Sequence, residues 1–224
     1  VELDKLAFLK DGVNMNLAIS KAGEKLPWGK SMETLAEKGY MGDSLLLNVQ
    51  RITSCASFAR MSGVQLPVMT TTGSGNQGIT LILTIAATAM ELKIPEDKML
   101  RAIAFAQAIN LYAKHYLGTL SCLCSCSVAS GLSASAGIVY MMGGSDQQVL
   151  DTMRNVLGSI SGMICDGAKE GCASKVCLST GLSVMSAMMA LNGMNTKPAD
   201  GILADNLKDL FTNLGNIANV GMAP

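Results

Sequence analysis

Charged and aromatic side chains are both scarce in this 224-residue sequence. Asp, Glu, Lys and Arg make up 15% of it, with seventeen basic residues balancing seventeen acidic ones, and aromatic residues make up 4%. A protein that binds nucleic acid needs a basic excess to neutralise phosphates, and it commonly uses aromatic rings to stack on bases. Because the sequence supplies neither, we expect no nucleic-acid partner.

Histidine is nearly absent as well, since His115 is the only one. A single imidazole excludes zinc sites built from several histidines, and it leaves a Ser-His-Asp triad only one choice of base. What the sequence does contain is 49% hydrophobic residues, including sixteen Met. A core of Ala, Leu, Ile, Val and Met with few rings favours packed helices over a β-sandwich, and so high an apolar fraction excludes disorder.

Three long stretches, 61–90, 116–145 and 176–196, carry no charged residue. Uncharged runs of about twenty residues raise the question of membrane spans. The first stretch contains the polar run 70–78, however, and the second contains seven Ser and five Gly. Small polar residues suit helices that cross closely inside a protein core. We therefore expect buried helices, no membrane partner and, because the start of the sequence does not match a secretory signal, a cytoplasmic location.

Apolar residues recur at helical spacing along the chain, and neither a strand pattern nor an internal repeat is present. The predicted helices cover about 2–24, 31–38, 43–61, 76–93 and 95–117, a segment that ends near 142, and then 145–163, 172–191 and 198–214. The stretch 119–131 fits a helix or a loop equally well. The prediction is an all-α bundle of about eight to nine helices, a single domain over residues 1–224, with buried central helices rich in apolar and small residues.

Several helix ends carry recognisable signals. Ser145 followed by Gln148 has the spacing of a capping box, and Gly118 is expected to close a helix. The segment Pro27-Trp28-Gly29 is expected to break the chain between two helices, and Pro198 is expected to begin the last one.

Seven cysteines occur, at positions 55, 122, 124, 126, 165, 172 and 177. An odd number in a chain without a secretory signal argues against a disulfide framework and fits metal ligation better. In the triplet Cys122-Leu123-Cys124-Ser125-Cys126 all three thiols share a direction if the segment is extended, whereas only Cys122 and Cys126 share a face if it is helical. The alternative is small apolar side chains in a core, which we expect of Cys55 and Cys177 because they lie in apolar helical runs.

Cys165 and Cys172 flank a turn that contains Gly167 and Gly171, whose backbone freedom lets the two thiols converge on one centre. Together with one thiol from the triplet they supply three thiolates. Three thiolates on a four-iron cluster leave one iron open as a Lewis acid. Zinc held by three cysteines and a water is the competing interpretation.

The segment Ser74-Gly75-Asn76-Gln77-Gly78 is a glycine-rich loop that leads into a helix. Backbone N–H groups at such a helix start favour an anion such as a substrate carboxylate, and the side chains of Asn76 and Gln77 can hydrogen-bond the polar ends of an amino acid. The segment lacks the Lys-Ser/Thr pair of a phosphate loop. The alternative interpretation is an ordinary loop with a helix cap.

Long motifs surround these candidate sites. They are Pro67-Val68-Met69, 73–79, Lys114 with Gly118, Leu120-Ser121, Cys124-Ser125-Cys126, 165–169, Gly171-Cys172-Ala173 and Lys175-Val176. In these motifs, over about residues 40–195, the chain resembles the L-serine dehydratase α-domain superfamily, and within it most closely the L-cysteine desulfidase branch. The resemblance implies a helical domain with an oxygen-sensitive [4Fe-4S] cluster held by three cysteines. The ligands it implies by position are Cys124, Cys165 and Cys172, with Cys126 as the alternative to Cys124.

The reaction implied by this resemblance is β-elimination from L-cysteine or L-serine, which yields pyruvate and ammonia and, from L-cysteine, sulfide. A base must remove the weakly acidic α-proton of this small amino-acid substrate. Lys114 and Lys169 are the catalytic candidates, expected to orient the carboxylate, and His115 is an alternative base, although a lone histidine at a helix end is more typical of a cap. The expected substrate-binding residues are Ser74, Asn76 and Gln77.

The sequence departs from the desulfidase pattern in one respect. Full-length desulfidases look about twice as long and carry near their N-terminus a Gly-Cys-Thr-Glu-Pro-like segment that supplies a catalytic cysteine, and nothing in this sequence matches it. We therefore expect the C-terminal portion of a longer chain, completed by an N-terminal domain or by homo-oligomerisation, or else a relative that has lost activity. The alternative function is a non-catalytic helical module that binds an iron–sulfur cluster or zinc and senses redox state.

The three uncharged stretches coincide with the three candidate site elements, which are the glycine-rich loop, the cysteine triplet and the helix after Cys172. A metal site that excludes water needs a lining poor in charge. We therefore expect all three stretches to line the site.

Overall fold

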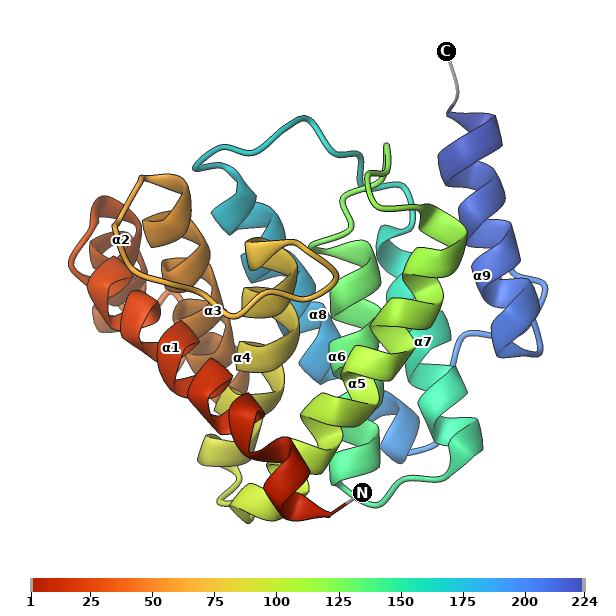
Figure 1. Cartoon of the computed structure of the whole chain (residues 1–224), viewed down its shortest axis with the longest axis horizontal. Coiled ribbons are helices and arrows are strands. Elements are labelled where there is room, and N and C mark those ends of the chain that lie inside the picture. The colour runs from red at the N-terminus through yellow and green to blue at the C-terminus, as the bar shows by residue number, and fades with distance from the viewer. Residues whose placement is uncertain (1, 223–224) are drawn as a thin grey trace.

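The computed structural model describes residues 2–222, and this part of the chain is built from helices (Figure 1). The α-helices are α1 (Ala7–Glu24), α2 (Pro27–Glu37), α3 (Leu45–Met61), α4 (Gly75–Glu91), α5 (Glu96–Leu117), α6 (Val128–Met141), α7 (Asp146–Ile160), α8 (Cys172–Leu191) and α9 (Leu207–Asn216). A 3-10 helix, η1 (Leu3–Leu6), precedes α1, and a π-helical segment, η2 (Ile217–Gly221), follows α9. Within residues 2–222 the only β-structure consists of two isolated bridges, so the predicted all-α bundle is confirmed.

Helices α4, α6 and α8 occupy the centre of the bundle (Figure 1). Helix α6 packs against α4, α5, α7 and α8, while α3 packs against α1, α4 and α8. Residues 75–89 of α4 are all buried, as is nearly all of α6. A helix that is surrounded by protein has no face for charged side chains, which explains why the sequence is uncharged over 61–90 and 116–145.

Helix α8 is the one helix among residues 2–222 that is long and apolar enough to cross a membrane, by length and composition only. Half of that apolar window is buried inside the bundle, where α8 packs against α3, α6 and α7. The hydroxyls of Ser179 and Ser183 donate to the backbone carbonyls of Ser127 (2.6 Å) and Gly131 (2.9 Å). A Cβ on Gly131 would lie 2.2 Å from Ser179 Oγ, so α6 and α8 approach closely. The small polar residues of these helices therefore serve interhelical contact, as expected from the sequence.

Local signals set several helix ends where the sequence predicts them. The Ser145 hydroxyl accepts from the backbone N–H of Gln148, and Gln148 Oε1 accepts from the backbone N–H of Ser145 at 2.9 Å, which completes the capping box of α7. The Ser44 hydroxyl caps α3 by accepting from the backbone N–H of Leu47 at 3.2 Å. Gly118 ends α5 with a φ of 76°, in the region that glycine tolerates.

Two expectations about proline need correction. Pro27 does not belong to the break between the two helices, because it is itself the first residue of α2. At that position its missing N–H has no intrahelical partner to lose. Pro198 does not begin the last helix. Ala199 takes a φ of 67°, which is incompatible with a right-handed helix, and α9 starts only after Asn206, whose side chain caps it.

Gly23 lies at a close approach of α1 and α3. A Cβ at this position would lie 2.0 Å from the backbone carbonyl oxygen of Cys55, an atom that cannot move without shifting α3. We predict that Gly23→Ala lowers the free energy of unfolding by about 1–3 kcal/mol, because overpacking outweighs the better helix propensity of Ala.

Gly158→Ala in α7 is the matched control. Gly158 is exposed, and the nearest atom to a new Cβ would be 3.4 Å away, an ordinary van der Waals contact. We expect this substitution to raise the free energy of unfolding by about 0.5–1 kcal/mol. Urea denaturation of both variants measures the two effects, and a Gly23→Ala variant as stable as the wild type would contradict the close α1–α3 contact.

Candidate functional site

Two loops that are distant in the sequence pair through their backbones beside the ends of α6 and α8. The backbone N–H of Cys124 donates to the carbonyl of Met163 at 2.8 Å, and the backbone N–H of Cys165 donates to the carbonyl of Cys122 at 2.7 Å. Between these bonds Leu123 faces Ile164 as an isolated antiparallel bridge. This pairing brings the cysteine triplet alongside the turn that carries Cys165.

The triplet is neither a helix nor an extended strand throughout. After Cys124 the chain turns, because the backbone N–H groups of Ser127 and Val128 both donate to the carbonyl of Cys124, at 2.9 and 2.8 Å. The turn leads directly into α6 and returns Cys126 to the side of Cys124. Cys122 remains exposed on the other side of the segment and does not share their cavity.

A cavity of about 410 Å³ lies at this junction. It is bounded by the loop before α4, the start of α4, the cysteine triplet, the 165–168 turn and the start of α8. Among the residues that line it are Ser74, Asn76, Gln77, Cys124, Cys126, Cys165 and Cys172. The structure thus brings together, in one cavity, the three expected substrate-binding residues and all four expected ligand cysteines, although their roles stay predictions.

The thiols of Cys124 and Cys126 differ sharply in acidity. A hydrogen bond from the thiol of Cys126 lowers the pKa of Cys124 to about 6, with further help from Ser127 and the charge of Lys175, against the opposing effect of burial. The same hydrogen bond raises the pKa of Cys126, since its proton is held there, and burial raises it further. These contacts therefore favour the thiolate form of Cys124, which is the form that binds metals.

The cysteines surround the cavity without meeting at one point. Over residues 2–222, no group of three or more His, Cys, Asp or Glu side chains lies close enough to hold a single metal ion. A zinc ion needs its ligands to converge on one atom, whereas a polynuclear cluster takes one thiolate at each of several irons. Among residues 2–222 the four thiols therefore border the cavity as separate groups rather than as a preformed single-metal site.

Asp166 connects the two lysines nearest the cavity mouth. Hydrogen bonds from Lys169 and then Lys175 hold the pKa of the Asp166 carboxyl far below its usual range. Lys175 lines the cavity and also donates to the carbonyl of Ile164 at 3.0 Å. Lys169, a catalytic candidate from the sequence, is exposed and does not line the cavity, and its ammonium pairs with Asp166. Lys169 therefore lies outside the cavity that the cysteines and the expected substrate-binding residues line.

Lys114, the other catalytic candidate, is 7% exposed and lies beneath the cysteine triplet. Its ammonium donates to the carbonyl of Thr119 at 2.9 Å and to Ser125 Oγ at 3.2 Å. Burial lowers the pKa of Lys114. Lys114 lines a second cavity of about 450 Å³, and Thr72 and Thr119 line both cavities, so Lys114 adjoins the thiol site. His115 is exposed and lies edge-on to Tyr116.

Two lining residues, Arg60 and Thr72, were missed in the sequence. Arg60 comes from α3, and its Nη1 donates to Asn76 Oδ1 at 3.3 Å. Thr72 has a φ of 47°, which is rare for a β-branched residue, and its hydroxyl lies 3.0 Å from Gln77 Oε1. A run of Thr before Gly73 was the only local signal for Thr72. Arg60 had none, because its position depends on how α3 packs against α4.

The third uncharged stretch, 176–196, contributes nothing to the cavity lining, which was an incorrect expectation. This stretch belongs to the part of α8 that packs in the bundle, and the lining ends at Lys175. The lining itself contains the charged residues Arg60, Asp166 and Lys175. The absence of charge therefore reflects helix burial in general rather than this site.

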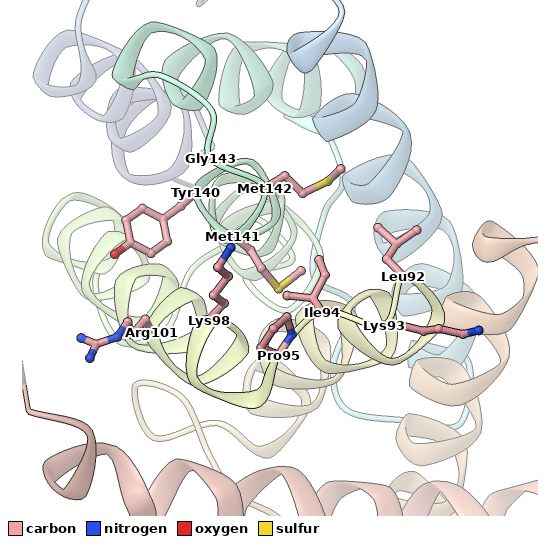
Figure 2. Close-up of a pocket in the computed structure, with 10 residues that line it drawn as sticks. All are labelled: Leu92, Lys93, Ile94, Pro95, Lys98, Arg101, Tyr140, Met141, Met142 and Gly143. Atoms are coloured by element: carbon pink, nitrogen blue, oxygen red, sulfur yellow. The ribbon is translucent and has the colours of Figure 1, made fainter.

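A larger hollow, of about 760 Å³, lies at the opposite end of α4 (Figure 2). Its lining comes from 92–95, α5 and the end of α6, and its charged members are Lys93, Lys98 and Arg101. Its lining includes neither a thiol nor a carboxylate. It thus lacks the thiolate, imidazole and carboxylate groups that commonly bind metals, and the cysteine cavity is the better candidate site.

Comparison with known proteins supports the resemblance along the whole chain. The family model for the serine dehydratase alpha chain matches residues 1–224. The chain is 38% identical to a UPF0597 protein of Alkaliphilus oremlandii, over 98% of its own length, and 40% identical to UPF0597 proteins of Alkaliphilus metalliredigens and Desulfotalea psychrophila, over 98% and 99%. It spans about half the length of these relatives, at 52%, 50% and 52%. No structure solved by experiment matches it.

Cysteine reactivity provides a test of this arrangement. Cys55 is fully buried in α3, and burial raises its pKa to about 12, so the thiol keeps its proton at pH 7. Cys122 and Cys165 are exposed. We predict that iodoacetamide alkylates Cys122 and Cys165 in the native, metal-free chain at neutral pH while Cys55 stays unmodified, as peptide mass spectrometry would show.

The control is the same reaction in denaturant, where all seven cysteines are expected to react. Cys177, whose pKa burial also raises, is expected to react more slowly than Cys165 in the native chain. Equal labelling rates at Cys55 and Cys122 without denaturant would contradict the burial of α3 against α1 and α8.

Proposed function

The chain belongs to the serine dehydratase alpha-chain family, and from that premise we propose that it is the cluster-binding part of an iron–sulfur-dependent lyase. The proposed substrates are L-cysteine and L-serine, and the proposed products are pyruvate and ammonia, with sulfide from L-cysteine. The observation that carries this proposal is the cavity in which separate segments place four cysteine thiols opposite the start of α4.

The proposed cluster ligands are Cys124, Cys165 and Cys172, with Cys126 as the alternative to Cys124. Cys124 is favoured because its pKa is lowered to about 6, so it offers a thiolate, whereas the raised pKa of Cys126 keeps its proton. Cys172 is the first residue of α8, so its side chain lies at the positive end of that helix dipole. A [4Fe-4S] cluster held by three thiolates supplies an open iron that acts as a Lewis acid toward the substrate's β-substituent.

The substrate's polar ends are proposed to contact the start of α4. Ser74, Asn76 and Gln77 line the same cavity as the cysteines, and they come from one helix start. The first backbone N–H groups of a helix have no intrahelical partner and bind anions. In this proposal they hold the substrate while its β-carbon faces the thiol-lined side.

Lys114 is the proposed base that removes the α-proton. Burial lowers its pKa, which increases the neutral amine that can accept a proton. Its Nζ contacts Ser125 Oγ, and Ser125 lines the cavity, so the Ser125 hydroxyl can take the α-proton while it gives its own proton to the neutral Lys114 amine. Lys169 is the weaker candidate, because it pairs with Asp166 at the surface.

The second candidate function is a non-catalytic cluster-binding module that senses redox state. The exposure of Cys165, an expected ligand, favours it, because an exposed ligand lets oxidants reach a cluster. The chain covers only about half the length of these relatives, which favours a larger assembly for either function. We propose that residues 1–224 fold as a single domain and that another domain or a second copy of the chain completes the site. The proposed location of the protein is the cytoplasm.

Cluster loading tests the ligand assignment. Anaerobic reconstitution with iron and sulfide should give the chain a visible thiolate-to-iron absorption band with one cluster bound per chain. Cys165→Ala and Cys172→Ala should lose the band, since a cluster with two thiolates is poorly held. Cys124→Ala should lose it and Cys126→Ala should keep it.

Cys177→Ala is the control, because Cys177 lies on α8 but does not line the cavity, and it should load as the wild type does. Full cluster loading of the Cys165→Ala or Cys172→Ala variant would contradict the assignment of that cysteine as a cluster ligand. A wild type that takes up zinc but no iron–sulfur cluster would favour the competing metal.

Activity tests the base. With the cluster-loaded native gene product and L-serine or L-cysteine, we predict that Lys114→Ala lowers kcat for pyruvate formation by at least about 100-fold, the usual scale of general base catalysis. Lys169→Ala should lower kcat less than about threefold, because its ammonium is screened and paired at the surface. The opposite ranking would assign the base role to Lys169.

A further inference from the structure

The start of α4 combines several features that favour an anion. Helix α4 has seventeen residues and begins at Gly75, and the side chain of its N-cap residue, Ser74, makes no capping hydrogen bond. The N–H groups of the first turn therefore lack the partner that a cap normally supplies. Ser74, Asn76 and Gln77 all line the thiol cavity, so this positive helix end borders the cavity.

A guanidinium group lies directly against this helix end. A Cβ on Gly75 would lie 2.3 Å from Arg60 Nε and 2.8 Å from Arg60 Cζ, so a side chain at position 75 would displace the guanidinium. Arg60 lines the cavity and donates through Nη1 to Asn76 Oδ1 at 3.3 Å. None of the ion pairs formed within residues 2–222 includes Arg60.

A cation against a helix N-terminus is the reverse of the usual preference, because both carry positive charge. Folding normally places Asp or Glu at this position, yet the first turn of α4 has no acidic residue. The unfavourable pairing becomes favourable when an anion lies between the guanidinium and the backbone N–H groups.

Two buried amides provide independent evidence for a ligand. Asn76 is 3% and Gln77 is 4% exposed. Asn76 Oδ1 accepts from Arg60 and Gln77 Oε1 accepts from the Thr72 hydroxyl, while the amide NH₂ groups of both residues have no hydrogen-bond partner within the described residues. Neither amide nitrogen is among the fully buried side-chain atoms that lack a partner, so both keep access to open space, and both residues line the cavity. An acceptor in the cavity would satisfy them.

We propose that Arg60 and the first turn of α4 form a carboxylate-binding site that selects ligands with a free α-carboxylate. This deepens the proposed function and rests on it for the identity of the ligand as an amino acid. Arg60 is the specificity-determining residue, because its planar guanidinium can bind both carboxylate oxygens. Gly75 is the residue that lets the guanidinium approach the helix.

A ligand of the same shape that lacks the carboxylate provides the test. L-Serine and L-serinamide both carry the ammonium and hydroxyl groups, but only L-serine has a carboxylate. We expect the wild-type chain to bind L-serine at least tenfold more tightly than L-serinamide, as measured by titration calorimetry. In Arg60→Gln the affinity for L-serine should fall about 10–100-fold, the scale of charge-assisted hydrogen bonds, while that for L-serinamide stays within about twofold.

Three further variants separate specificity from folding. Arg60→Lys should keep part of the preference, and Gly75→Ala should reduce it in the same way as Arg60→Gln. Arg51→Gln is the matched control, since Arg51 lies on the same helix but pairs with Glu24 away from the cavity. Thermal unfolding of each variant shows whether it folds, and a structural role for Arg60 would change stability without changing the ratio of the two affinities.

The outcomes of this experiment and of cluster loading are distinguishable. A chain that loads no cluster but prefers L-serine through Arg60 contradicts the proposed lyase and supports the carboxylate site. A cluster-loaded chain in which Arg60→Gln discriminates as well as the wild type overturns the role of Arg60 and leaves the lyase standing. Equal affinity of the wild type for L-serine and L-serinamide, or binding of neither, overturns the carboxylate site.

Discussion

The candidate site depends on one short piece of backbone pairing, between the segments around Leu123 and Ile164. Two hydrogen bonds and one bridge hold a loop that follows α5 against a loop that follows α7. Leu123 is 1% exposed, so its side chain anchors the pair in the core. Without this pairing the thiols of Cys124 and Cys165 would belong to two independent loops. The bundle below acts as the frame, because the tight contacts of α6 with α8 fix where both loops begin and end.

Charge is distributed differently in the central helices and at the site. Helices α4, α6 and α8 carry almost no charge, and their buried hydroxyls bond to neighbouring backbone, as Ser179 does to Ser127. At the site, Asp166 lies between Lys169 and Lys175, and Cys126 donates to Cys124. Arg60 differs from these groups, because its polar contacts in the described chain are to Asn76 and a methionine sulfur. Away from the site, the buried pair of Asp151 and Arg154 shows that charge also serves the packing of the bundle.

The sequence was informative wherever the signal was local. Apolar spacing predicted the all-α fold, and the Ser145–Gln148 pair and Gly118 marked helix ends correctly, because caps act within one turn. Pro198 misled, since the turn conformation at Ala199 overrides its preference for a helix start. The conformation of the cysteine triplet was undecidable for the same kind of reason, because a partner forty residues away sets it. The contacts of Arg60 with α4 are also tertiary, and no spacing along the chain encodes them.

The paired loops have a further consequence for how the site responds to a ligand. Two segments joined by shared hydrogen bonds order together, so the conformational entropy lost by fixing one is partly already lost for the other. A ligand that contacts both segments therefore meets Cys124 and Cys165 already fixed relative to each other, so less conformational entropy is left to lose on binding. The helix bundle thus acts as a rigid support for a preorganised pair of loops.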